Sequence, residues 1–157
     1  MHACQSWLLW LGLFLASCAQ LHSQGFPLPA PKDSVKILID AQRIETARIW
    51  EDGSPSAQSE AFSMLLHDDD AASAFASLFK SASGVAGRLY ALLGLSRCNP
   101  QQYTALARSL TLDQVVPVLW YDVMREMRVS EILKMIEDGS LYKAVYPPPA
   151  AVDATEL

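Results

Sequence analysis

The sequence predicts a mainly α fold with a small β component (α+β), a compact bundle of short helices with two or three short strands. Three observations lead to this fold class. Apolar residues recur with the period of a helix in several segments. Among these segments lie two that are rich in β-branched residues, which favour strands. The chain has 157 residues and is 51% hydrophobic and 18% charged, which is enough for one domain with a buried core.

Composition divides the chain into four parts. Residues 1–17 contain no Asp, Glu, Lys or Arg and are expected to be a signal peptide. Residues 18–34 carry prolines at alternate positions, which restrict the backbone and favour an extended linker. We expect the globular domain at residues 35–146 and a disordered tail at residues 147–157, which begins with three consecutive prolines.

The domain is expected to begin with a helix and a strand. Ser34 is a suitable N-cap for a short helix over residues 35–42 (VKILIDAQ). Residues 44–50 (IETARIW) are partly alternating and β-branched, so they predict a strand. The next residues, 51–55 (EDGSP), predict a turn.

Four helices are predicted next, at residues 57–67, 71–82, 85–96 and 100–110. The apolar spacing is most regular in residues 71–82, for which Asp70 is the expected N-cap. Residues 85–96 are apolar around most of the helix circumference, so we expect this helix at the centre of the core. Asn99 and Pro100 predict the start of the fourth helix, because proline fits the first helical position.

Residues 113–128 carry an ambiguous pattern. Their valines and aromatic residues favour a strand, which we predict at residues 114–121 and pair with residues 44–50. Pro117 then requires a sheet edge or a bulge, because it has no backbone N–H to donate.

A last helix is predicted at residues 130–138, beginning at Ser130. Leu133 stands where a capping box would need Glu or Gln, so Glu131 is not expected to complete one. Gly139 is expected to end this helix at its C′ position.

Residues 7–16 (WLLWLGLFLA) form an unbroken apolar run near the N-terminus. The run is too short to cross a hydrocarbon core, which needs ~20 residues. Its length fits the apolar region of a secretory signal, and Ala16 and Ser17 supply small residues before a cleavage site. The Lys or Arg that normally precedes such a run is absent, which indicates a weakly charged signal or a misplaced start codon.

The residues Leu15-Ala16-Ser17-Cys18 resemble the lipobox of the bacterial lipoprotein signal. The resemblance implies that the Cys18 thiol receives a diacylglyceryl group and that cleavage makes Cys18 the new N-terminus. Two or more acyl chains hold a protein stably on a membrane. Ala19 follows, with no Asp to indicate inner-membrane retention, so the resemblance implies an outer membrane location facing the periplasm.

Two alternatives to lipidation remain open. Ser17-Cys18-Ala19 also fits an ordinary signal peptidase site, which would give a secreted or soluble periplasmic protein. The apolar run would otherwise be a buried N-terminal helix. Residues 77–110 are loosely similar to a HEAT-type helix pair, through the sequence LYALLGL and the Asn-Pro turn after it, but no second copy follows at a fixed period.

Cysteine usage agrees with the lipoprotein interpretation. Cys4 leaves with the signal and Cys18 is lipidated, so Cys98 has no partner within the chain. We expect Cys98 to be a half-buried small apolar residue near a helix end. If Cys18 carried no lipid, a Cys18–Cys98 disulfide would become possible.

The one dense polar cluster is His67-Asp68-Asp69-Asp70. His67, Asp68 and Asp70 are weak candidates for a divalent metal site, because imidazole and carboxylate groups are metal ligands. Consecutive side chains point in different directions, so we favour a turn between two helices, with no bound cofactor. The aromatic residues Trp50, Trp120 and Tyr121 could form a binding surface, but core packing across the two predicted strands is favoured.

Two functional hypotheses remain. The favoured one is a membrane-anchored, non-enzymatic lipoprotein whose domain contacts an envelope protein partner or serves as a structural module. The alternative is an envelope hydrolase or metal-dependent enzyme that uses His67 and nearby carboxylates, although no known catalytic motif is present. Nucleic acid is not an expected partner, because Lys and Arg are not clustered and the net charge is -5 at pH 7.

Overall fold

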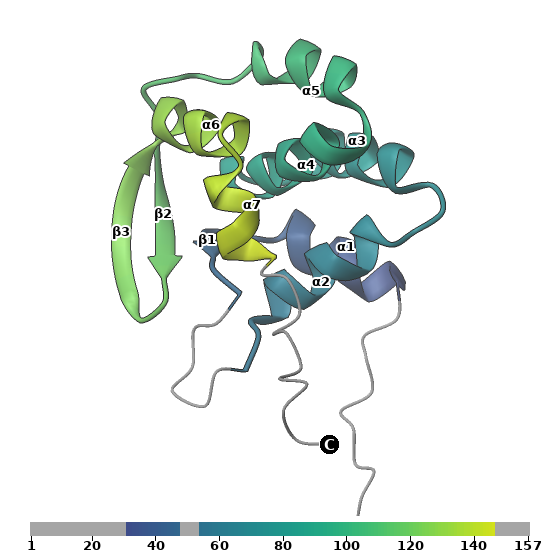
Figure 1. The fold of residues 1–157 in the computed structure, drawn as a ribbon, viewed down its shortest axis with the longest axis horizontal. Helices are drawn as coiled ribbons and strands as arrows, with labels where there is room; N and C mark the ends of the chain where they lie inside the picture. Colours follow the sequence, from purple (N-terminus) through teal and green to yellow (C-terminus); the bar gives the residue numbers. More distant parts are fainter. Residues whose placement is uncertain (1–30, 48–53, 147–157) are drawn as a thin grey trace, which may run out of the picture.

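The computed structural model describes residues 31–47 and 54–146. Within these ranges, a bundle of short helices carries a small three-stranded sheet at one flank (Figure 1), which confirms the predicted fold class. In chain order the elements are α1 (Pro31–Ile39), β1 (Ile44–Glu45), α2 (Ala57–Leu66), α3 (Ala71–Ser81), α4 (Val85–Cys98), α5 (Pro100–Ala107), β2 (Val115–Trp120), β3 (Val123–Arg128), α6 (Val129–Glu137) and α7 (Ser140–Val145). The expected signal peptide, the expected tail and most of the expected linker lie outside the described residues.

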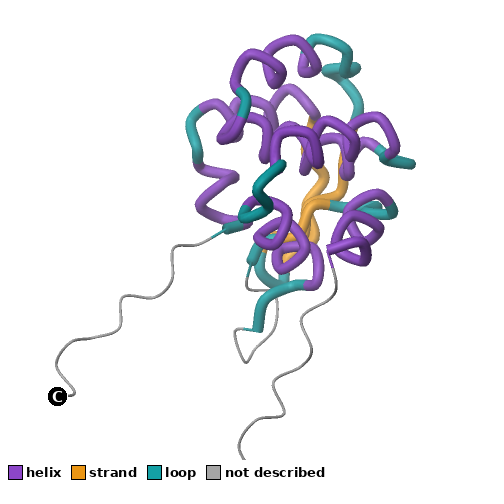
Figure 2. Tube along the Cα trace, turned by 90° about the vertical axis from the view of Figure 1, so that its right-hand side faces the viewer, coloured by secondary structure: helices purple, strands orange, loops and turns teal. Residues whose placement is uncertain are grey.

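Helix α4 occupies the centre of the core, as predicted. It contacts five other helices and two strands, namely α1, α2, α3, α5, α6, β1 and β2. Its side chains are buried on nearly every side from Ala86 to Leu95, because the helix is surrounded rather than laid on a surface. Figures 1 and 2 show the other helices above and below it, with the sheet at one flank.

Two glycines of α4 allow neighbouring helices to approach closely. A Cβ atom at Gly87 would collide with the backbone carbonyl of Leu38 in α1, and a Cβ atom at Gly94 would overlap the ring of Phe75 in α3. The glycines therefore determine how close α1 and α3 lie to the central helix.

The sheet has the order β1-β2-β3. Strands β1 and β2 are parallel, with Ile44 opposite Val118, which confirms the predicted pairing. Strand β1 is much shorter than predicted, and residues 48–50 of that prediction lie outside the described part of the chain. Pro117 is tolerated in β2 because β1 pairs only with Val118 and Leu119, so the position of the missing N–H is a local edge.

Strand β3 is the part of the ambiguous segment that we did not assign. It pairs with β2 in an antiparallel hairpin closed by the two residues Tyr121 and Asp122. Val116 and Val118 of β2 face the core, whereas almost all of β3 is exposed. The prediction failed because β3 carries three charged residues and little of its surface is buried, so no alternation of apolar and polar residues marks it.

Neither of two predicted N-cap residues caps a helix with its side chain, although α3 begins at Ala71 as predicted. Ser34 does not cap a helix, because α1 begins earlier at Pro31 and the buried Ser34 hydroxyl instead donates a hydrogen bond to Met64 Sδ at 3.3 Å. Asp70 stands at the N-cap of α3 but makes no side-chain capping bond. The carboxylate of Asp68 accepts from the Asp70 N–H at 2.9 Å, which stabilises the turn before the helix.

The C-terminal region contains one helix more than predicted. Helix α6 begins at Val129, and Glu131 Oε2 accepts from the Arg128 N–H at 2.9 Å, so this carboxylate does serve as a cap. Gly139 ends α6 with a φ of 77°, which confirms the predicted left-handed stop. The chain then turns directly into α7, which has only six residues and no strong sequence signal.

Two side chains are more exposed than expected. Cys98 is exposed rather than half-buried, because it lies at the surface end of α4. Tyr121 is 58% exposed at the turn of the hairpin, so it does not pack in the core, whereas Trp120 is half-buried. Trp50 lies outside the described residues. In the described ranges, no helix is both long enough and apolar enough to cross a membrane.

Candidate functional site

The imidazole of His67 lies at the C-terminal end of α2 and contacts two neighbours. Its Nδ1 atom is 2.8 Å from the carbonyl oxygen of Ser63, one helical turn earlier. Because a carbonyl can only accept, Nδ1 carries the proton. The other ring nitrogen, Nε2, is 3.5 Å from the hydroxyl oxygen of Tyr146, which can donate to it. The ring of His67 is therefore held between α2 and the end of α7.

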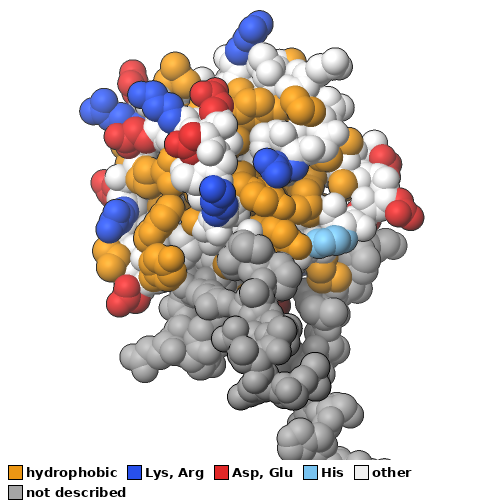
Figure 3. Space-filling view, in the orientation of Figure 1, with side chains coloured by type: hydrophobic (Ala, Val, Ile, Leu, Met, Phe, Trp, Pro, Cys, Tyr) orange, Lys and Arg blue, Asp and Glu red, His pale blue; other side chains and the backbone are white. Residues whose placement is uncertain are grey.

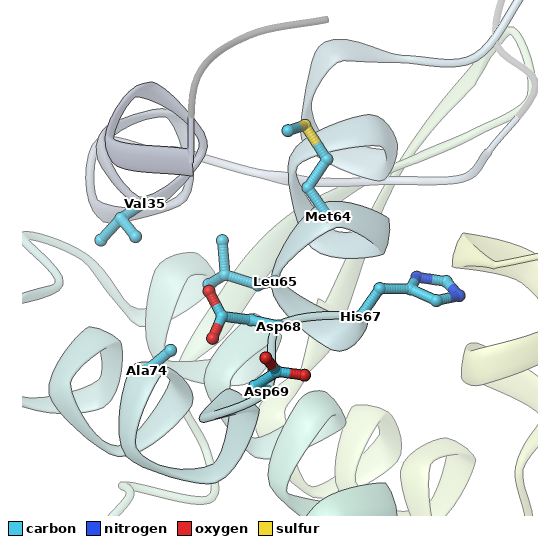
Figure 4. Close-up of a pocket in the computed structure, with 7 residues that line it drawn as sticks. All are labelled: Val35, Met64, Leu65, His67, Asp68, Asp69 and Ala74. Carbon is cyan, nitrogen blue, oxygen red and sulfur yellow. The ribbon is translucent and has the colours of Figure 1, made fainter.

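The carboxylates beside His67 do not converge on it. Figure 4 shows the ring of His67 pointing toward α7, while the carboxylates of Asp68 and Asp69 point elsewhere. Asp68 Oδ1 also accepts from the Asp70 N–H. Among residues 31–47 and 54–146, no three His, Cys, Asp or Glu side chains lie close enough to hold a metal ion. The structure thus does not bring His67, Asp68 and Asp70 together as ligands.

A pocket of about 500 Å³ opens on the other side of the same turn. It lies between α1, α2 and α3, and its lining consists of Val35, Met64, Leu65, His67, Asp68, Asp69 and Ala74 (Figure 4). The lining combines four apolar side chains with two carboxylates, so the pocket suits an apolar group that carries a positive charge. The pocket is wide open to solvent, so it is a shallow surface depression and not an enclosed small-ligand site.

A row of side chains in contact extends from His67 across the surface, and we call it the Arg97–His67 row. The rings of His67 and Tyr146 have centroids 6.0 Å apart, and those of Tyr146 and Tyr142 are 5.5 Å apart. The guanidinium carbon of Arg97 lies 4.4 Å from the centroid of Tyr142. Tyr142 and Tyr146 are neighbours because they are four residues apart on α7.

The row joins the surface to the core. The ring of Tyr142 lies edge-on to that of buried Phe62, with centroids 6.4 Å apart. Burial raises the pKa of Tyr142, and the nearby Arg97 charge opposes this effect. The hydroxyl therefore stays protonated at neutral pH, while the Arg97 cation rests on the ring face. In Figure 3 the pale blue side chain of His67 borders an orange apolar surface over α7.

Sequence reasoning found His67 but missed the rest of the row. The signal available was the four-residue spacing of Tyr142 and Tyr146. This spacing is a weak signal, because Gly139 predicts the end of the last helix just before it.

A second surface feature is apolar and lies on the sheet. The exposed large hydrophobic side chains of the described residues all fall between positions 112 and 124. They are Leu112, Val115, Tyr121, Val123 and Met124. Four of these five belong to the β2–β3 hairpin and its turn. The hairpin therefore leaves several apolar side chains uncovered, and Val123 and Met124, which are consecutive in β3, lie on opposite faces of its end.

Comparison with known proteins gives no match for this chain, whether to a protein-family model, to a curated protein or to a solved structure.

Proposed function

We propose that the protein is a lipoprotein of a bacterial envelope, held on the membrane by lipid on Cys18. The observation that carries this proposal is the sequence Leu15-Ala16-Ser17-Cys18, which closes an uncharged apolar run of suitable length. A thiol at this position is where the lipid would be attached, and Ala19 favours the outer membrane, with the domain in the periplasm.

The helical domain would then act as a non-enzymatic interaction module. The Arg97–His67 row supports this role, because Arg and Tyr are the residues that most often dominate binding energy at protein interfaces. The row is anchored in the core through Phe62 and offers the Arg97 cation, two hydroxyls and an imidazole. A partner protein with an acidic group beside an aromatic or apolar side chain would suit it.

Lipid labelling tests the anchor. Cells that express the wild-type protein, Cys18→Ala or Cys98→Ala are grown with radiolabelled palmitate, and the immunoprecipitated protein is counted. We expect label on the wild type and on Cys98→Ala and none on Cys18→Ala. Label that persists in Cys18→Ala, or wild type that never takes label, contradicts the anchor.

Cross-linking in intact envelopes tests the interaction module. The wild type, Arg97→Ala and Arg125→Ala are compared, since Arg125 is an exposed arginine on the hairpin, away from the row. A partner of the row should be recovered with the wild type and with Arg125→Ala, and lost with Arg97→Ala. Equal recovery with all three proteins contradicts a role for the row.

A further inference from the structure

The end of the β2–β3 hairpin combines exposed apolar side chains with aromatic ones. Tyr121 is 58% exposed, Val123 48% and Met124 50%, and the half-buried Trp120 lies beside them. We call residues 120–124 the hairpin tip. The rings of Trp120 and Tyr121 meet edge-on, with centroids 6.5 Å apart.

The hairpin tip is fixed to the domain. The backbone N–H of Tyr121 donates to the hydroxyl of Thr46 at 2.9 Å, and Thr46 is 1% exposed. The Thr46 N–H in turn donates to the carbonyl of Leu119 at 3.0 Å. These bonds tie the turn of the hairpin to the segment that follows β1, so the apolar side chains are presented on a rigid support.

The turn keeps a tyrosine where the backbone disfavours one. Tyr121 has a φ of 57°, and it is the one non-glycine residue with positive φ in the described ranges. Two-residue hairpin turns prefer Asn, Asp or Gly at such positions, because a bulky side chain is strained there. More than half of the Tyr121 side chain remains exposed, so the domain itself gains little from this ring. We infer that the ring is used outside the domain.

We propose that the hairpin tip inserts into the interfacial zone of the bilayer that holds the lipid anchor. This inference rests on the proposed function. Residues 19–30 separate Cys18 from the start of α1, and a chain of that length spans at most about 40 Å. The domain would therefore stay next to the membrane. Figure 1 shows the turn of the hairpin and the Pro31 end of α1 on the same side of the molecule, so both can face one surface.

The chemistry of the tip suits a bilayer of low net charge. Tyrosine and tryptophan prefer the boundary between headgroups and acyl chains, and valine and methionine can enter the apolar side of that boundary. Asp122 at the turn and Arg125 behind it cancel in charge, while the whole chain carries a net charge of -5. An anionic surface would therefore repel the domain, and a zwitterionic one would not.

Quenching of Trp120 fluorescence by brominated lipid tests the insertion. The full chain is expressed with Trp7→Phe, Trp10→Phe and Trp50→Phe, which leaves Trp120 as the sole tryptophan. The purified protein is reconstituted in phosphatidylcholine vesicles with and without bromine on the acyl chains. We expect strong quenching by the brominated lipid, and weaker quenching when anionic phosphatidylglycerol is added. Asp122→Asn should restore quenching on the anionic vesicles.

Matched variants distinguish insertion from simple proximity. Replacing Tyr121, Val123 and Met124 by serine should abolish the quenching. Leu112→Ser should retain it, because Leu112 is equally exposed, at 52%, but precedes the opposite end of the hairpin. Far-ultraviolet circular dichroism confirms that each variant is folded.

The outcomes separate this inference from the proposed function. Lipidated protein without quenching of Trp120 overturns the inference and leaves the anchor intact. If the protein carries no lipid, quenching on added vesicles still supports insertion, and its absence overturns it. If Trp120 becomes shielded in the absence of vesicles, with a matching rise in the mass of the particle, the tip binds a second copy and the inference is wrong.

Discussion

The hydroxyl of Tyr90 bonds to both backbone polar groups of Glu45. It accepts from the Glu45 N–H at 2.8 Å and donates to the Glu45 carbonyl at 3.2 Å. Tyr90 is on the central helix α4, and Glu45 is on β1, whose other edge pairs with β2. One fully buried side chain thus satisfies the free edge of the sheet, where a fourth strand would otherwise be needed.

Replacing Tyr90 by phenylalanine should destabilise the domain by about 1–3 kcal/mol, because two buried backbone groups of Glu45 lose their partner. The change removes one oxygen atom and leaves the ring in place, so packing is nearly conserved. Urea unfolding measures the free energy of unfolding. The matched control near neutral pH is Tyr103→Phe. Tyr103 is half-buried, and its hydroxyl contacts Glu137 Oε1 at the long distance of 3.5 Å, so its removal should change stability by less than about 0.5 kcal/mol. Equal effects of the two changes would refute the role of Tyr90.

Stability should fall in alkaline solution. Burial, with the Glu137 carboxylate adding to it, raises the pKa of Tyr103 from 10 to about 12, and burial raises the pKa of Tyr90 in the same direction. The folded state therefore holds protons that the unfolded state releases. The contribution of the protonated Tyr103 hydroxyl to the free energy of unfolding is complete below pH 10 and is lost as the pH rises through about 12.

Unfolding curves between pH 8 and pH 12 measure this loss. Tyr103→Phe should lose less stability than the wild type between pH 10 and pH 12, since the titrating hydroxyl is gone. Glu137→Gln should give a smaller change of the same sign. If the free energy of unfolding falls with pH equally steeply in Tyr103→Phe and in the wild type, the Tyr103 hydroxyl does not contribute to the loss of stability.

Alanine at Gly94 should destabilise the domain by up to about 2 kcal/mol. Replacing a glycine inside a helix by alanine normally raises the free energy of unfolding by about 1 kcal/mol. Here the new Cβ would overlap the ring of Phe75, and overpacking of a core costs about 1–3 kcal/mol.

Two further variants make this effect specific. Gly84→Ala creates no steric overlap, because its Cβ would meet only the carbonyl oxygen of Ala41 at 3.5 Å, so its cost should be limited to the poorer N-cap that alanine gives α4. In a Phe75→Leu background, Gly94→Ala should be less harmful than in the wild type, since a smaller side chain leaves room. Additive effects of the two changes would argue against the steric explanation.

Any effect of zinc on the melting temperature should be the same for the wild type and for His67→Ala. The proton on Nδ1 is committed to the Ser63 carbonyl, and the carboxylates of Asp68 and Asp69 point away from the ring. Thermal unfolding is followed while zinc is added to the wild type and to His67→Ala. A stoichiometric rise that disappears in His67→Ala would restore the metal-dependent alternative.

The sequence was informative where burial shapes the pattern of residues. Helix α4 could be recognised as central because it is apolar on nearly all sides, and the pairing of β1 with β2 followed from two β-branched segments. Strand β3 could not be recognised, because it contributes little to the core and its side chains need not alternate.

The candidate site was only partly predictable for a related reason. His67 was found because it lies in a run of polar residues, but its true neighbour, Tyr146, is 79 positions away. Arg97 and Tyr142 likewise meet only after α4 and α7 have packed. The roles of Ser34 and Glu131 differ from those predicted because α1 begins at Pro31 and α6 at Val129, earlier than the predicted helices.

The parallel pairing of β1 with β2 also has a consequence for the order of events during synthesis. Ile44 finds its partner only when Val118 is available, and helices α2 to α5 lie between them in the chain. Contacts between such distant positions form slowly, since a long loop must close first. On the ribosome, the N-terminal half therefore has no completed sheet until most of the chain has emerged. A nascent chain whose sheet is still incomplete is less able to fold early, which is the property that the export we propose for this protein would require.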